Sequence, residues 1–96
     1  MTINQIELLV GIQALMISGA KQTGLRIVHD TRGGSDERGT YVCSDIRVYD
    51  DALELLHQTK VMIGHDGRDD PGKYASAHER TLEQQRDALA EFIAAH

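Results

Sequence analysis

The sequence has no tryptophan, one phenylalanine and one cysteine, and these shortages limit what it can be. A single cysteine, Cys43, cannot form a disulfide within the chain, whereas small secreted domains usually depend on several. We therefore expect a cytoplasmic protein, in which Cys43 is either a small apolar residue of a strand or a reactive thiol. Because aromatic residues are scarce, the core has to be built from aliphatic side chains.

Basic residues are too few and too scattered to form a cationic patch. Ten Lys and Arg stand against fifteen Asp and Glu, which gives a net charge of −5. General nucleic-acid binding needs clustered cations that displace counterions, and attraction to an anionic membrane needs them too. We expect neither partner. The uncharged run over residues 8–20 is also shorter than the roughly 20 apolar residues that span a bilayer.

The 96 residues suffice for a single domain, 1–96, and their patterns predict an α+β fold. Capping boxes at Thr2–Gln5 and Ser76–Glu79 indicate two helix starts, and alternating apolar residues indicate strands. The predicted order is α-β-β-α-β-α, a small three-stranded sheet packed against two long helices. The elements expected are helices over 3–21 and from Ser76 onward, strands over 25–30, 40–50 and 59–66, and a short helix over 50–58.

The first predicted helix has more apolar positions than one buried stripe requires. We therefore expect it to be covered on more than one side, with a homodimer through the helix at 3–21 supplying part of the cover. Gly11 lies in the middle of this helix, where glycine costs about 1 kcal/mol relative to Ala. A close neighbour explains it, either within the chain or across the dimer.

Two similar segments, "IVHDTRGG" (27–34) and "IGHDGRDD" (63–70), each place His-Asp after an apolar run. Each His extends the apolar row of its predicted strand, and each Asp faces the other way. One interpretation is structural: half-buried His residues at a sheet margin, and Asp residues that start turns. The other is a divalent metal site made by His29, His65 and a carboxylate.

The direction of the strands decides between these interpretations. A helical crossover over residues 50–58 makes the third strand run opposite to the first and separates the two His-Asp ends. A chain reversal in those residues brings the two ends to the same side of the sheet, and nine residues are short for a crossover.

Other site motifs fail on inspection of the chain. The stretch "DGRDDPGKYASA" begins like a calcium loop but has Ala77 where a bidentate Glu is needed. The glycine-rich "RGGSDERG" lacks the Lys of a phosphate-binding loop, and no Ser stands in a nucleophile-elbow context. We therefore expect no catalytic residue, no metal and no cofactor.

The remaining signal is the dense mixture of acids and Arg that follows each His-Asp pair. We expect it to bind a protein partner electrostatically, with the Arg residues paired either to neighbouring acids or to the partner. The protein is then a non-catalytic inhibitor or adaptor, a type common among phage and mobile-element products that act on host machinery. The alternative is a small metal-dependent enzyme that uses the paired His-Asp segments. The predicted partner-binding residues are Asp30, Arg32, Asp36, Glu37, Asp66, Arg68, Asp69 and Asp70.

Overall fold

The computed structural model describes residues 3–37, 39–63 and 81–96. The fold is α+β, with the three strands and the two long helices that were predicted, but its order is α-β-β-β-α because residues 50–58 do not form the short helix. The elements are α1 (Ile3–Thr23), β1 (Arg26–Asp36), β2 (Gly39–Tyr49), β3 (Leu55–Ile63) and α2 (Leu82–Ala94).

Helix α1 begins where it was predicted and ends two residues later. Its C-terminus is closed by Gly24, which adopts a φ of 73° and whose N–H donates to the Ala20 carbonyl at 2.9 Å. Glycine takes this left-handed conformation without the steric cost that a side chain brings. At 21 residues, α1 is long and apolar enough to cross a membrane by length and composition, which residues 8–20 alone are not.

Strand β1 continues far beyond the predicted end at residue 30. Its pairing with β2 runs from Arg26 opposite Tyr49 to Asp36 opposite Gly39, so the loop expected over 31–39 is mostly strand. Gly34 lies under the Tyr41 ring, whose Cζ is 2.5 Å from the position that a Cβ at Gly34 would take. An aromatic ring packed over a strand glycine replaces the missing side chain, which is why a glycine-rich segment can pair here.

The helix predicted over residues 50–58 is wrong, because residues 50–54 reverse the chain in a tight turn and residues 55–58 belong to β3. Asp50 Oδ1 accepts hydrogen bonds of 2.9 Å from the backbone N–H groups of Ala52 and Glu54, and Leu53 has a φ of 62°. The Asp side chain thus closes a turn instead of capping a helix. Strand β3 then runs antiparallel to β2, so β1 and β3 run in the same direction.

Helix α2 begins at Leu82, six residues after the predicted start at Ser76. The capping box is formed by Thr81 and Gln84, with Gln84 N–H donating to Thr81 Oγ1 at 3.2 Å and Thr81 N–H donating to Gln84 Oε1 at 3.0 Å. Ser76 and Glu79 lie outside the described residues. The apolar residues of α2 recur with helical spacing, and Leu82, Leu89 and Ile93 are buried.

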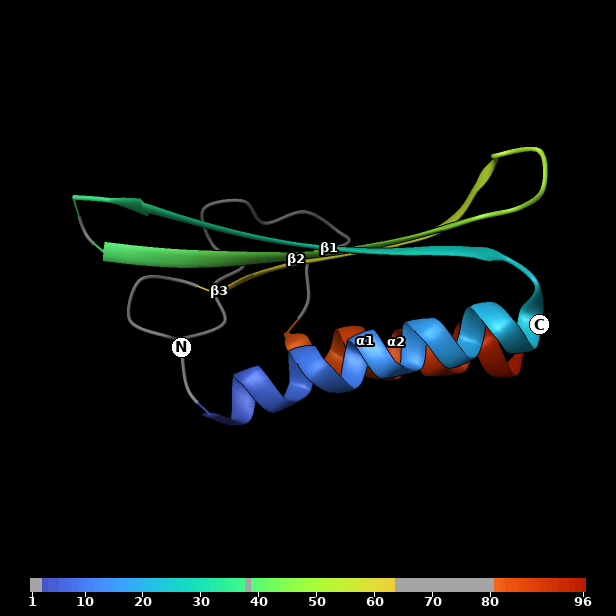
Figure 1. Ribbon diagram of the computed structural model, residues 1–96, viewed down its shortest axis with the longest axis horizontal. Helices are drawn as coiled ribbons and strands as arrows, with labels where there is room; N and C mark the ends of the chain where they lie inside the picture. Colours follow the sequence, from blue (N-terminus) through green and yellow to red (C-terminus); the bar gives the residue numbers. More distant parts are fainter. Residues whose placement is uncertain (1–2, 38, 64–80) are drawn as a thin grey trace.

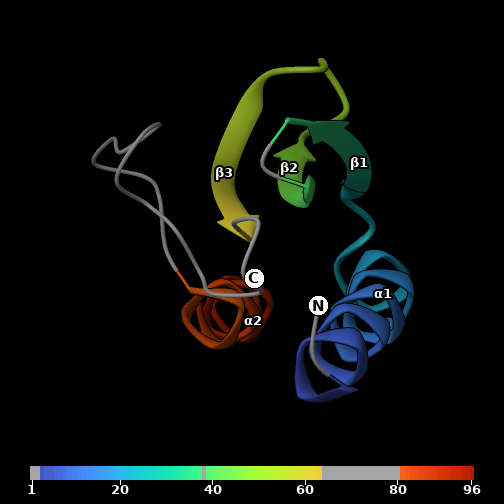
Figure 2. The same cartoon turned by 90° about the vertical axis from the view of Figure 1, so that its left-hand side faces the viewer.

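The sheet is an antiparallel meander in the order β1-β2-β3, and both helices pack on one of its faces (Figures 1 and 2). Helix α1 lies beneath β1 and α2 lies beneath β3, side by side. The core fills the space between the two layers and is aliphatic, as the composition predicted. Its buried residues are Leu9, Ile12, Ile27, Ile46, Val48, Val61, Ile63, Leu82, Leu89 and Ile93.

Within a single chain, helix α1 is buried on one face only, and the predicted cover from a homodimer stays a prediction. Leu9 and Ile12 are buried, and Leu15 is half-buried against the core. Ile3 and Ile17 remain exposed, by 76% and 65%. The single chain therefore covers one apolar stripe of α1 and leaves a second one in contact with solvent.

The close approach expected at Gly11 occurs at Gly19. No described atom lies within 4 Å of the position that a Cβ at Gly11 would take, whereas a Cβ at Gly19 would overlap the Ile93 side chain of α2 and come within 3.3 Å of Ile27 Cδ1. Gly19 thus lets α1 approach both α2 and β1. Gly11 has no packing explanation within the described chain.

Candidate functional site

The face of the sheet opposite the helices is covered by no described helix or strand, and we call it the outer face (Figure 1). Strand alternation and cross-strand register assign its members. They are mostly charged or aromatic, in contrast to the aliphatic inner face. The outer face consists of Arg26, Val28, Asp30, Arg32, Tyr41, Cys43, Asp45, Arg47, Tyr49, Gln58, Lys60 and Met62.

Two carboxylates stand opposite each other at the centre of this face. Asp30 on β1 is the direct cross-strand partner of Asp45 on β2, an arrangement that is destabilising unless cations offset it. Arg32 donates to Asp30 Oδ2 from Nε and Nη2, at 2.9 and 2.7 Å. Arg47 Nη2 lies 3.3 Å from Asp45 Oδ2 and 3.9 Å from Asp30 Oδ2. Lys60 on β3 is the cross-strand partner of Asp45 on its other side.

These contacts change the acidity of the central groups. The hydrogen bond from Arg32, together with the nearby positive charges, lowers the pKa of Asp30 below its usual range. A hydrogen bond to the Tyr49 hydroxyl and the neighbouring Asp45 raise the pKa of Arg47. Both shifts favour the charged forms, so Asp30 is a carboxylate and Arg47 a guanidinium cation at neutral pH.

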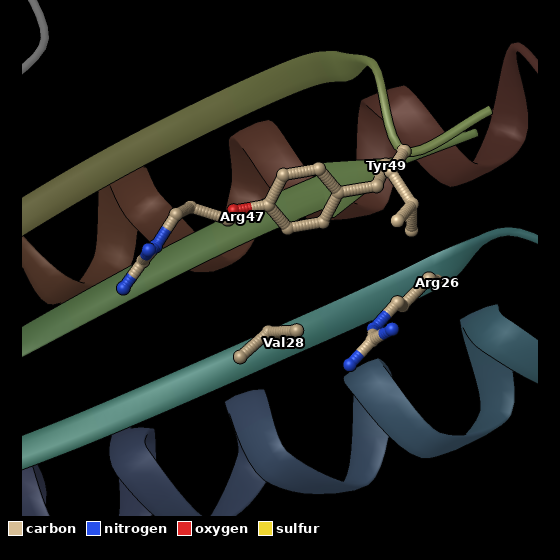
Figure 3. Close-up of a pocket in the computed structure, with 5 residues that line it drawn as sticks. Arg26, Val28, Arg47 and Tyr49 are labelled. Carbon is tan, nitrogen blue, oxygen red and sulfur yellow. The ribbon is translucent and has the colours of Figure 1, made fainter. Parts of the chain in front are cut away.

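A shallow cavity of about 300 Å³ opens at one end of the outer face, lined by Arg26, Val28, Arg47, Tyr49 and Leu53. Figure 3 shows Arg26 and Val28 on β1 facing Arg47 and Tyr49 on β2, with the Tyr49 hydroxyl beside Arg47. The lining contains two guanidinium groups and no carboxylate. This end of the face is therefore positively charged within an acidic protein, and it suits a carboxylate held against an apolar wall.

His29 does not end its strand but lies within β1, on the inner face, and is half-buried. Its Nε2 is 2.7 Å from Ser44 Oγ, which is 2.8 Å from Gln85 Oε1. The Gln85 amide nitrogen donates to the carbonyls of Ser44 and Thr59, at 3.0 and 3.2 Å, so Oε1 faces Ser44. The Ser44 hydroxyl therefore donates to Gln85 and accepts from His29 Nε2–H.

The direction of these hydrogen bonds argues against Ser44 and His29 as a nucleophile and its base, the pair that a serine hydrolase uses. A nucleophilic serine must give its proton to the histidine, but here Ser44 gives it to Gln85 and is fully buried. Burial lowers the pKa of His29, against the opposing effect of Asp30 and Asp45. The trio is best understood as a buried structural cluster, and the half-buried His of the structural interpretation is confirmed at His29.

The metal interpretation is tested only in part. The chain reversal that it needs is present, because β1 and β3 run the same way. No group of three or more His, Cys, Asp or Glu suited to a metal ion occurs among the described residues. The second segment with His65 and Asp66 lies outside them.

The predicted partner-binding residues fall into three groups. Asp30 and Arg32 are ion-paired on the outer face, so Arg32 pairs within the chain and Asp30 starts no turn. Asp36 and Glu37 lie at the hairpin between β1 and β2, where Glu37 is exposed to solvent. The other four, namely Asp66, Arg68, Asp69 and Asp70, lie outside the described residues.

The sequence interpretation missed Arg26, Arg47 and Tyr49, which together form most of the cavity. The sequence carries the signal, because alternation along residues 40–50 places one set of side chains on the face opposite the apolar positions, namely Tyr41, Cys43, Asp45, Arg47 and Tyr49. What was missing was the pairing that sets Arg26 beside Tyr49. Comparison of the chain with family models, with curated proteins and with solved structures gives no match.

Proposed function

We propose that this protein is a non-catalytic inhibitor or adaptor that binds another protein through the outer face of its sheet. The observation that carries the proposal is the asymmetry of the sheet. Two helices cover its inner face, while the outer face presents an ordered set of charged and aromatic side chains to solvent (Figures 1 and 3). Charged groups arranged in this way give specificity and association rate more than stability.

The cost of the central carboxylate pair supports a binding role. Asp30 and Asp45 are placed where like charges weaken strand pairing by up to about 1 kcal/mol. Exposed ion pairs contribute little to the free energy of unfolding. The ion pairs of Arg32 and Arg47 therefore do not make this part of the sheet stabilising. Opposed carboxylates such as Asp30 and Asp45 are expected where a residue is needed for recognition of a partner and not for folding.

The cavity indicates which group of the partner is recognised. Arg26 makes no ion pair with any described residue, and Arg47 shares its charge with Asp30 and Asp45. A partner Asp or Glu that enters between these guanidiniums gains charge-assisted hydrogen bonds, while Val28 and Leu53 contact its methylene groups. We therefore propose an acidic segment of a partner protein as the ligand of the cavity, in a phage-like or mobile-element setting where the target is a host protein.

The test is capture of partners from a native host lysate with three matched baits: the wild-type chain, Arg26→Glu and Lys21→Glu. Lys21 is exposed and belongs to α1, a helix on the inner side of the sheet (Figure 1), and its reversal changes the net charge by the same amount. We expect a partner that binds the wild type and Lys21→Glu, is lost with Arg26→Glu, and associates more slowly at high salt. A partner retained equally by all three baits, or no partner at all, would overturn the proposal.

A further inference from the structure

A second apolar stripe runs along the solvent side of α1. Its large side chains are Ile3, Ile6, Val10 and Ile17, exposed by 76%, 45%, 63% and 65%. Together they expose an area on the order of a few hundred Å², the size at which an apolar patch marks an interaction site. We call Ile3, Ile6, Val10 and Ile17 the α1 stripe.

The spacing of the stripe is that of a helix that packs on another helix. From Ile3 the steps are three, four, three and four residues, through Ile6, Val10, Gln13 and Ile17. This is the alternation of the a and d positions of a heptad, which keeps one seam directed at a partner helix. Gln13 is the single polar member, and one polar residue at such a position fixes register and orientation.

We infer that the α1 stripe binds the α1 stripe of a second copy of this chain, in antiparallel orientation. An antiparallel pair opposes the two helix dipoles, whereas a parallel pair aligns them. In an antiparallel pair, an a residue of one helix packs against a d residue of the other helix. They place Ile6 against Ile17 of the partner at both ends and Val10 against Gln13 of the partner in the middle.

The extent of the helix agrees with a dimer. Twenty-one residues make a helix about 30 Å long, so pairing along its length offers an interface near the lower end of the stable class, about 600 Å² per partner. A membrane surface fits less well, because a helix that lies on anionic lipid carries Lys or Arg beside its apolar stripe, and α1 has only Lys21 in a chain of net charge −5.

Such a dimer leaves the outer faces of both sheets free. The helices lie on the inner side of the sheet, so joining two chains through α1 turns the two outer faces away from each other (Figure 1). The dimer then presents two copies of the cavity and gives avidity toward a partner that is itself repeated. The dimer does not depend on the proposed function, since it uses a different surface.

The test compares the wild type with Ile17→Glu and Leu53→Glu by sedimentation equilibrium. Ile17 and Leu53 are almost equally exposed, by 65% and 64%, but only Ile17 belongs to the α1 stripe. We expect the wild type and Leu53→Glu to sediment at twice the chain mass of 10.6 kDa at micromolar concentration, and Ile17→Glu to sediment as a folded monomer with an unchanged circular dichroism spectrum. A wild-type monomer at about 100 µM, where even a weak pair associates, would overturn the inference, as would a dimer in all three chains.

Orientation and the membrane alternative are tested separately. In a Cys43→Ala background, Ile6→Cys and Ile17→Cys chains are expected to form a mixed disulfide when combined, and cross-linking of each variant only with itself would overturn the antiparallel arrangement. Vesicles of phosphatidylcholine and phosphatidylglycerol are the probe for lipid. Vesicle binding by a monomeric wild type, lost in Ile17→Glu, would show that the stripe faces a bilayer and not a second copy.

Discussion

The Ser44 hydroxyl donates a hydrogen bond of 2.8 Å to Gln85 Oε1, and both side chains are completely buried. This contact joins the middle strand of the sheet to α2, across 41 residues of chain. The amide group of Gln85 also donates to carbonyls of two strands. A polar residue in the middle of an aliphatic core therefore specifies how α2 sits on the sheet.

Replacing Gln85 by Leu is expected to lower the free energy of unfolding by about 1–3 kcal/mol, because the buried Ser44 hydroxyl loses its acceptor. The measurement is urea denaturation. Glu91→Leu, at an exposed position of the same helix, is the control and is expected to change stability by less than about 0.5 kcal/mol. The double variant Ser44→Ala, Gln85→Leu is expected to lose less free energy of unfolding than the two single variants lose together. Additive losses would mean that the two side chains are not coupled.

Protonation of His29 is expected to destabilise the fold. Its pKa is lowered by burial, so between this lowered value and the ordinary value near 6.5 the unfolded chain binds more protons than the folded one. Stability therefore falls as pH decreases from about 7.5 to about 5. Urea midpoints across this range should decrease less in His29→Gln than in the wild type, and parallel curves for the two proteins would contradict the assignment.

The glycines of α1 provide a matched pair of substitutions in one helix. Gly11→Ala is expected to raise stability by about 1 kcal/mol, because the exposed helix interior gains the better helix former and no described atom obstructs it. Gly19→Ala is expected to lower stability by about 1–3 kcal/mol, since its Cβ meets Ile93 and Ile27 in the core. The measurement is the thermal unfolding midpoint of each variant, compared with that of the wild type. A destabilised Gly11→Ala would mean that another surface packs closely there.

Cys43 is expected to be an unreactive thiol in the folded protein. Burial raises its pKa, which reduces the thiolate fraction at neutral pH, in spite of the opposing charge of Lys60. Alkylation by iodoacetamide at about pH 7.5 should be at least several-fold slower in the native protein than in denaturant. Equal rates would show that Cys43 is accessible and active, which is the reactive-thiol alternative of the sequence interpretation.

The sequence by itself determined the elements whose signals are local. The long apolar helix near the N-terminus, the alternation of β2 and the apolar positions of α2 all follow from periods of 3.6 or 2 residues. The outer face of β2 followed as well, since alternation alone separates Arg47 and Tyr49 from Ile46 and Val48. These patterns can be recognised without knowing which strand or helix packs against each element.

Only the tertiary structure decided the rest, because cross-strand pairing overrides local preference. Gly33 and Gly34 favour a loop by composition, yet Tyr41 from β2 covers Gly34 and allows β1 to continue. Residues 50–58 suit a short helix by capping signals, yet the pairing of β3 with β2 favours a turn at Asp50. The site depended on the same pairing, since Arg26 and Tyr49 are 23 positions apart in the chain and become neighbours only when β1 and β2 come into register.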